Sequence, residues 1–121
     1  MTRRLLAEFI GTAFLLAGVV GSGIMAERLT DDTAVALLAN AAATAGVLYV
    51  IIVVFGPVSG AHFNPAVTIT DLVLGGIERG VAAWYVVVQV VGAAAGVMVA
   101  NVMFELDAVN LSDTTRDGYG Q

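Results

Sequence analysis

Apolar and polar positions divide this chain into three long apolar stretches joined by short polar connections. The stretches are Leu5–Met25, Val35–Phe55 and Ala82–Phe104, of 21, 21 and 23 residues, and Glu8 is the only charged residue within them. Each stretch reaches the roughly 20 residues that a helix needs to cross a bilayer. The pattern therefore predicts an all-α membrane protein with three transmembrane helices.

A polar stretch, Ser59–Thr68, interrupts the apolar pattern between the second and third predicted spans. Asn64 and Pro65 are the residue types of a helix N-cap and a first helical position. The helix that they open is short, because the ten residues from Pro65 to Leu74 extend roughly 15 Å, about half of a hydrocarbon core. Since the flanking spans run in opposite directions, residues 56–74 begin and end on one side. We therefore expect a re-entrant loop with a half-helix; the alternative is a cytoplasmic amphipathic linker.

The arginines at the start of the chain set the expected orientation in the membrane. Arg3 and Arg4 precede the first span, whereas the connection Ala26–Ala34 carries three acids and one arginine. Because cytoplasmic connections are rich in basic residues, the N-terminus is expected in the cytoplasm of a multi-pass protein.

The first span has an alternative interpretation as a secretory signal peptide, since two arginines precede an apolar run that ends in small residues. Its apolar run is longer than a typical signal sequence, and Glu8 lies inside it. We therefore expect a retained span.

Composition excludes several classes of function. The chain is 59% hydrophobic and 12% charged, with mean hydropathy +0.91 and net charge −5. All five basic residues are scattered arginines, which is no nucleic-acid-binding signature. The absence of cysteine excludes disulfides and thiol catalysis. A single histidine, His62, makes a poor metal site, and no catalytic set is apparent, so we expect neither an enzyme nor a cofactor.

Five side chains carry candidate chemistry. Asn64 can cap the short helix with its oxygen and keep its amide NH₂ for a passing water or hydroxyl. Glu8 is expected to accept hydrogen bonds from the loop, with Gln89 in a similar structural role; a proton-carrying Glu8 in a small coupled transporter is the weaker alternative. His62 is expected to line a pore or brace the loop. Asp71 shares a face with Asn64, either at an inner mouth or paired with an arginine, Arg4 or Arg79.

Three motifs resemble the major intrinsic protein family of aquaporins and aquaglyceroporins. The most specific is Ser59–Thr68 with its Asn-Pro-Ala at Asn64, Pro65 and Ala66; the others are Ala7–Thr12 and Gln89–Gly92. The resemblance implies a passive channel for water or small neutral solutes such as glycerol or arsenite. It further implies that Asn64 donates to the permeant and that His62 and the carbonyls of Gly60 and Ala61 line the pore. Glu8, Gln89, Pro65 and Ala66 would support the loop.

The resemblance covers only the N-terminal half of such a channel. Residues 1–121 correspond to one half-repeat of three spans and one half-helix, and Thr114–Gln121 resembles the linker to a second half. The family resemblance thus implies pairing with a second half or with copies of this chain, in a tetramer-like homo-oligomer in a bacterial inner membrane. The alternative is a non-conducting, truncated protein that assembles with full-length channels and modulates them.

A position twenty residues before Asn64 bears on selectivity. In the family this second-helix position lines the narrowest point of the pore and is often Phe or Trp; here it is Thr44. A smaller, polar side chain implies a wider opening, which resembles members that pass glycerol or neutral metalloid acids.

Overall fold

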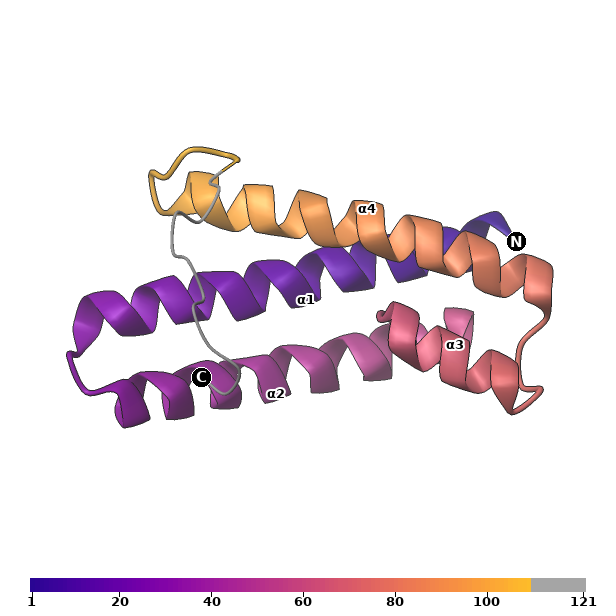
Figure 1. Cartoon of the computed structure of the whole chain (residues 1–121), viewed down its shortest axis with the longest axis horizontal. Coiled ribbons are helices and arrows are strands. Elements are labelled where there is room, and N and C mark those ends of the chain that lie inside the picture. The colour runs from indigo at the N-terminus through magenta and orange to yellow at the C-terminus, as the bar shows by residue number, and fades with distance from the viewer. Residues whose placement is uncertain (110–121) are drawn as a thin grey trace, which may run out of the picture.

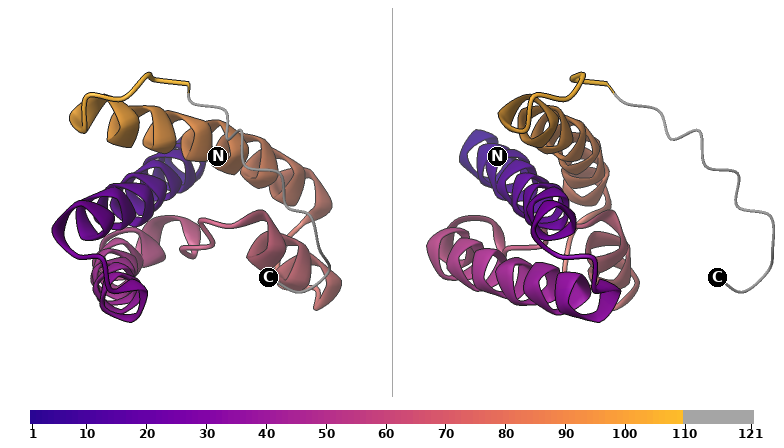
Figure 2. Two further views of the ribbon diagram at one scale, coloured as in Figure 1. Left: turned by 60° about the vertical axis from the view of Figure 1, so that its left-hand side comes forward. Right: turned by 90° about the vertical axis from the view of Figure 1, so that its left-hand side faces the viewer.

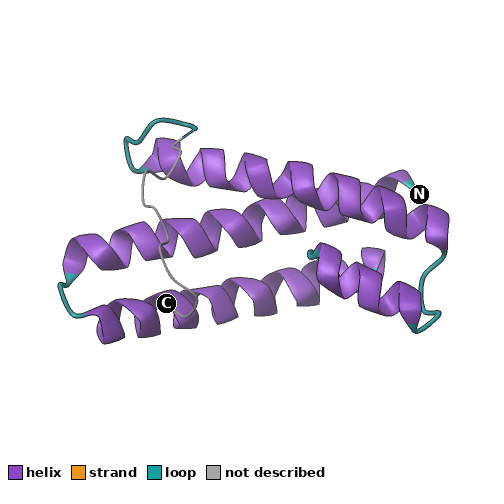
Figure 3. Ribbon diagram, viewed as in Figure 1, coloured by secondary structure: helices purple, strands orange, loops and turns teal. Residues whose placement is uncertain are grey.

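Four helices make up the part of the chain that the structure describes, residues 1–109 of a computed structural model (Figure 1). They are α1 (Thr2–Leu29), α2 (Thr33–Ser59), α3 (Pro65–Val73) and α4 (Arg79–Met103). Loops alone connect them, without a strand in this range (Figure 3). α1, α2 and α4 are each long and apolar enough to cross a membrane, which confirms the three predicted spans.

The second helix is longer than its apolar run predicts. α2 continues through Gly56 and Pro57 to Ser59, so the irregular segment is only Gly60–Asn64. Pro57 lies two residues before the end of α2. The hydrogen bond that its missing N–H removes is therefore in the last turn, where it bends the helix least.

The short helix starts where the Asn-Pro pair predicts. Asn64 is the N-cap of α3 and Pro65 its first residue, while the helix ends at Val73, one residue before the predicted Leu74. The expected linker, Thr114–Gln121, lies outside the described residues.

α1 lies between the other long helices and packs against both, whereas the backbones of α2 and α4 do not pack on each other within residues 1–109. Figure 2 shows this arrangement from two further sides. α3 starts near the middle of the long helices, runs to the end where α4 begins, and packs on α4 (Figure 1). The loop after α2 thus leads to mid-depth, and α3 returns to the end of the bundle where α4 begins, as expected for a re-entrant loop with a half-helix.

Small residues allow α1 and α4 to cross closely. A Cβ atom on Gly92 would meet the backbone carbonyl oxygen of Phe9, and one on Gly96 would meet that of Ala13. Glycine at a four-residue spacing is a common way to bring two helix backbones together in a membrane. This glycine pair therefore serves packing within the chain.

Polar contacts connect the helices at the end of the bundle where α1 and α4 finish and α2 begins. Asn40 on α2 donates to the Val19 carbonyl at 2.7 Å and to the Ser22 hydroxyl at 3.0 Å, both on α1. Arg28 of α1 donates to the Phe104 carbonyl at 2.8 Å and lies over the Phe104 ring at 5.2 Å. The guanidinium thus gives the Phe104 carbonyl a hydrogen-bond donor at the end of α4. Its positive charge also interacts favourably with the negative end of the α4 helix dipole.

Large apolar side chains cover the outer surface of the long helices. Only 6% of the apolar segment of α2 is buried against the rest of the chain. Such surfaces require lipid or protein against them, so the arrangement is that of a multi-pass membrane protein.

Substituting Gly92 tests the close crossing. Gly92→Ala should lower the free energy of unfolding by about 1–3 kcal/mol, because its Cβ forces α1 and α4 apart. Gly46→Ala is the matched control, since a Cβ there meets nothing within 4 Å. Unfolding by denaturing detergent in mixed micelles measures both. Equal stability of the two variants would contradict the close packing.

Candidate functional site

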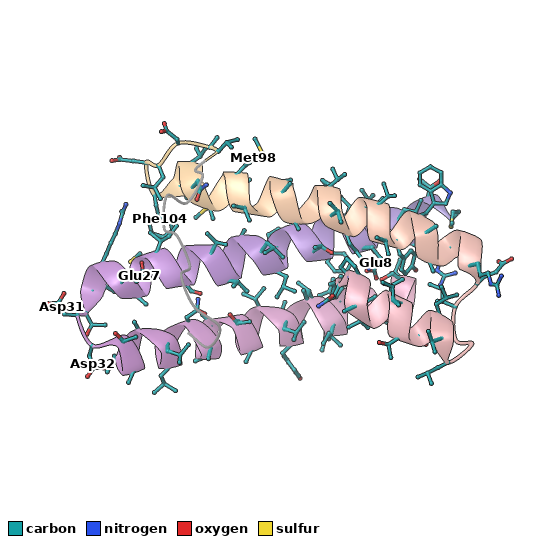
Figure 4. The ribbon with its side chains drawn as sticks, viewed as in Figure 1. Glu8, Glu27, Asp31, Asp32, Met98 and Phe104 are labelled. Carbon is teal, nitrogen blue, oxygen red and sulfur yellow. The ribbon has the colours of Figure 1, made fainter. Side chains whose placement is uncertain are left out.

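The site is built around Glu8, a carboxylate in the interior of the membrane-spanning bundle. Glu8 is fully buried, with 0% of its surface exposed. Figure 4 shows it where α1 passes α3 and α4, far from the acids Glu27, Asp31 and Asp32 at the opposite end. A buried charge without partners is expensive, so the groups around Glu8 decide whether this arrangement is stable.

Four donors satisfy the two oxygens of the Glu8 carboxylate. Oε1 accepts from the Ser59 hydroxyl at 2.6 Å and from the backbone N–H of His62 at 3.0 Å. Oε2 accepts from the backbone N–H of Phe63 at 2.7 Å and from the Gln89 amide at 2.8 Å. Hydrogen bonds to a charged acceptor are short and strong. Glu8 therefore joins the end of α2, the loop and α4 to α1.

The loop between α2 and α3 has an unusual backbone that these bonds hold in place. Gly60 has φ +91°, and the non-glycine residues Ala61 and Phe63 have φ +57° and +49°. Each left-handed non-glycine residue costs roughly 1–2 kcal/mol. The Phe63 side chain is 1% exposed and lies against Gly11, where a Cβ would overlap the ring. Ring burial and the Glu8 bonds together offset the backbone cost.

The first turn of α3 presents unused donors beside unused acceptors. The side-chain oxygen of Asn64 accepts from the Ala66 N–H at 2.8 Å, and Pro65 has no N–H. Asn64 is exposed, and its NH₂ group makes no hydrogen bond within residues 1–109. In the same range, no hydrogen bond is accepted by the carbonyls of Gly60, Ala61 and His62. A polar molecule at this surface would find both a donor and acceptors.

A second set of hydrogen bonds runs from Gln89 to the histidine ring. The Gln89 amide donates to Thr68 Oγ1 at 2.9 Å, and the Thr68 hydroxyl lies 3.0 Å from Nδ1 of His62. Gln89 and Thr68 are both fully buried. The Gln89 side chain thus connects the Glu8 carboxylate to α3 and to the side chain of His62.

A third connection comes from the start of α1. Arg4 Nε donates to the Tyr85 hydroxyl at 2.9 Å, and that hydroxyl donates to the Ser59 carbonyl at 2.7 Å. The Tyr85 ring also packs edge-on against His62, with centroids 5.4 Å apart. Tyr85 therefore fixes the end of α2, and the loop that follows, against α4.

Most of the predicted residues lie together, and Thr44 does not. Thr44 is on α2, four residues after Asn40 and three before Val47, and both of these neighbours contact α1. Its side-chain oxygen is buried and has no hydrogen-bond partner within the described residues. Thr44 thus lies on the α1-facing side of α2, separate from the loop contacts.

Sequence reasoning assigned no role to Thr68, Tyr85 or Ser59. Thr68 follows Asn64 by four residues, and this helical spacing was a usable signal; Tyr85 stands in an apolar run with no such signal. Asp71 contacts His62, with 3.5 Å between Oδ2 and Nε2, and no ion pair joins it to an arginine within residues 1–109.

Comparison with known proteins agrees with this geometry. The profile of the major intrinsic protein family matches residues 1–120. The chain belongs to the major intrinsic protein family. Aquaglyceroporin AqpS of Rhizobium meliloti (strain 1021) is 49% identical over 121 residues, which are 100% of this chain and 52% of that protein.

More distant family members show the same partial coverage. Aquaporin Z of Brucella melitensis is 32% identical over 122 residues, covering 100% of this chain and 53% of the relative. Aquaporin NIP1-2 of Arabidopsis thaliana is 34% identical over 105 residues, covering 87% and 35%. The chain thus spans about half the length of these two bacterial relatives and matches 35% of the plant protein.

Replacing Glu8 tests the central carboxylate. Glu8→Gln keeps the size but turns one acceptor into an NH₂ group that faces donors. Each buried group left unpaired costs about 1–3 kcal/mol, so unfolding should become easier by at least that amount. Hydrogen exchange at the Phe63 amide should accelerate in parallel.

Thr12→Val is the matched control for Glu8→Gln. The Thr12 hydroxyl is also buried and, among the described residues, bonds only to the Glu8 backbone carbonyl, at 2.7 Å. The control should leave the Phe63 exchange rate unchanged. An unaltered rate in Glu8→Gln as well would show that the carboxylate does not hold the loop.

Proposed function

We propose that this chain supplies one half of a passive membrane channel for water and small neutral solutes. The observation that carries the proposal is the exposed Asn64 amide at the N-cap of α3, beside loop carbonyls of Gly60, Ala61 and His62 that accept no hydrogen bond within residues 1–109. α3 starts near the middle of the long helices (Figure 1). Membership of the major intrinsic protein family supports a channel of this class.

The mechanism we propose is replacement of the solute's hydration along one wall. A water or alcohol hydroxyl leaving bulk solvent accepts from the Asn64 NH₂ and donates to the loop carbonyls, so its hydrogen bonds are exchanged rather than lost. His62, partly exposed beside these carbonyls, forms part of the same wall. Glu8, Gln89, Pro65 and Ala66 hold the wall in position. Ions are excluded, because two or three neutral dipoles do not offset the loss of an ion's hydration.

A complete pore in this proposal requires a second half. The chain provides one half-helix and spans about half of its bacterial relatives. An inverted repeat would bring a second half-helix toward α3 and close the other wall. A second copy of this chain or a separate half could supply it, within a tetramer-like homo-oligomer. Arg3 and Arg4 favour a cytoplasmic N-terminus in a bacterial inner membrane.

The proposed solutes are glycerol and neutral metalloid acids such as arsenite, as well as water. One relative is named an aquaglyceroporin. Thr44 supports a wide opening, because a Thr side chain is smaller than the Phe or Trp common at this position in the family.

Stopped-flow permeability of proteoliposomes tests the channel and the role of Asn64. The chain reconstituted with the complementary half of a family member should pass water and glycerol, whereas the chain alone in one orientation should give only background flux. Asn64→Asp should abolish more flux than Asn64→Ser, because Asp caps a helix equally well but introduces an anion and removes the NH₂ donor. The charge costs on the order of 3 kcal/mol at bilayer depth. Equal flux and equal cation exclusion in both variants would reduce Asn64 to a helix cap.

A second substitution tests the solute class. In the same two-half assembly, Thr44→Phe should reduce glycerol or arsenite flux much more than water flux, because an aromatic ring narrows the opening. Thr44→Val, which keeps the volume and removes the hydroxyl, separates size from hydrogen bonding. An unchanged ratio of glycerol to water permeability in Thr44→Phe would assign Thr44 to the α1–α2 interface alone.

A further inference from the structure

Asp71, near the end of α3 away from Asn64, contacts the His62 ring, and the proposed channel assigns no role to this contact. Nε2 of His62 lies 3.5 Å from Oδ2 of Asp71, and the two side chains are 12% and 36% exposed. This separation is longer than a good hydrogen bond from a neutral ring, which spans about 2.7–3.2 Å. It is within the range of an ion pair. The two groups are therefore too far apart for a good hydrogen bond and close enough for an ion pair when the ring is charged.

The turn after α3 is shaped around the Asp71 carboxylate. A Cβ on Gly76 would overlap the Asp71 side-chain oxygens. The Gly76 N–H also donates to the Asp71 backbone carbonyl at 2.9 Å. Glycine at position 76 thus leaves the space that the carboxylate occupies, an observation independent of the distance to His62.

The hydrogen bonds of Thr68 and the position of Asp71 together favour one tautomer of the neutral His62 ring. Glu8 can only accept, so Gln89 turns its NH₂ group to Glu8 and to Thr68. The Thr68 oxygen then accepts from Gln89 and has its own proton to give to Nδ1 of His62. The Asp71 carboxylate faces Nε2, where a lone pair would be repelled, so it favours the tautomer with the proton on Nε2.

The network also has a place for a second proton. Thr68 Oγ1 lies 3.3 Å from the Gln89 carbonyl oxygen as well as 3.0 Å from His62 Nδ1. If Nδ1 is protonated, it donates to Thr68, whose hydroxyl turns to the Gln89 carbonyl oxygen. No buried group loses a partner in this rearrangement.

The charged and titratable groups around His62 come from three helices. Asp71 on α3 faces Nε2, and Glu8 on α1 accepts the His62 backbone N–H. Tyr85 on α4 lies against the ring, and Arg4 on α1 lies over the Tyr85 ring at 5.5 Å. The C-terminal end of α3, close to Asp71, adds a partial negative charge. Asp71 is thus the anion that the ring itself contacts.

We propose that His62 and Asp71 form a proton-responsive pair at this end of α3. His62 takes one proton from hydronium, which leaves as water. The Thr68 hydroxyl reverses from His62 to Gln89, and the charged ring draws the Asp71 carboxylate into a hydrogen bond at Nε2. Imidazole is the side chain that ordinarily changes charge between about pH 5 and 8.

The consequence for transport rests on the proposed function. With His62 neutral, this end of the solute path carries one negative charge from Asp71; with His62 protonated, the pair is neutral. Acidification therefore removes a charge that attracts cations and repels anions, and neutral solutes keep their path. Asp71 would be a residue that determines selectivity through His62 and touches no permeant itself.

Nuclear magnetic resonance on the whole chain in lipid nanodiscs tests the pair without any flux measurement. His62 is the single histidine of the sequence, so a ¹⁵N-histidine label reports on it alone. At pH 8 we expect a protonated Nε2 and an unprotonated, hydrogen-bonded Nδ1. Toward pH 5, Nδ1 should become protonated, the Nε2–H proton should move downfield, and the Gln89 side-chain amide should shift with the same pH profile.

Four variants separate the two halves of the proposal. Asp71→Asn and Gly76→Ala should lose the downfield movement of the Nε2–H proton, since one removes the charge and the other displaces it. Gly80→Ala should behave as the wild type, because a Cβ there meets nothing within 4 Å. Thr68→Val should lose the Gln89 response and keep protonation of His62. An unshifted Phe63 amide resonance shows that the loop is intact in each variant.

Two results would overturn the pair: wild-type behaviour of Nε2–H in Asp71→Asn, or equal losses in Gly76→Ala and Gly80→Ala. A Gln89 amide resonance that does not respond to pH in the wild type would contradict the proposed turn of the Thr68 hydroxyl from His62 to Gln89. A chain that shows the full response yet supports no flux with a second half would contradict the channel and leave the pair standing, so the two proposals fail separately.

Discussion

The buried carboxylate of Glu8 is the interaction on which the rest of this structure depends. A charge in the interior of a membrane bundle is tolerated only where fixed donors replace its hydration, and Glu8 has four of them. Two of these donors are backbone N–H groups of the loop. The same hydrogen bonds therefore satisfy the carboxylate and fix the loop. An unpaired carboxylate or an unpaired loop N–H in the interior would each cost free energy.

The close crossing of α1 and α4 brings Glu8 and Gln89 together. Gly92 lies against the backbone of Phe9, the residue next to Glu8, and Gln89 is one helical turn before Gly92. A larger residue at position 92 would move Gln89 away from the carboxylate. Backbone packing at the glycines thus sets the length of a side-chain hydrogen bond, 2.8 Å from Gln89 to Glu8.

The sequence was sufficient for features that depend on local pattern, and insufficient for those that depend on tertiary contact. Apolar run length predicted three spans, and the Asn64–Pro65 pair predicted the start of α3. No local rule predicts left-handed backbone at Ala61 and Phe63, because Glu8 and the Phe63 pocket impose it from outside the loop. The roles of Tyr85 and Thr68 likewise appear only when α3 and α4 are side by side.

The same contrast between local pattern and tertiary contact explains why α2 extends beyond its predicted end at Phe55. Glycine and proline at positions 56 and 57 favour a loop by local preference, yet α2 continues to Ser59. The Ser59 hydroxyl bonds to Glu8, and its carbonyl accepts from Tyr85. Two long-range contacts at one residue hold the last turn of α2 against its local tendency to end.

Buried and exposed polar groups have different roles in this arrangement. The Glu8 carboxylate is enclosed and accepts hydrogen bonds from three elements, so its charge does not bias the exposed surface. The groups that lack a hydrogen-bond partner in the described part of the chain, the Asn64 NH₂ and the loop carbonyls, are uncharged and fixed in direction. A surface of oriented neutral dipoles can exchange hydrogen bonds with a neutral solute but cannot replace the hydration of an ion. Enclosing the charge is thus the structural condition that lets the exposed wall remain neutral.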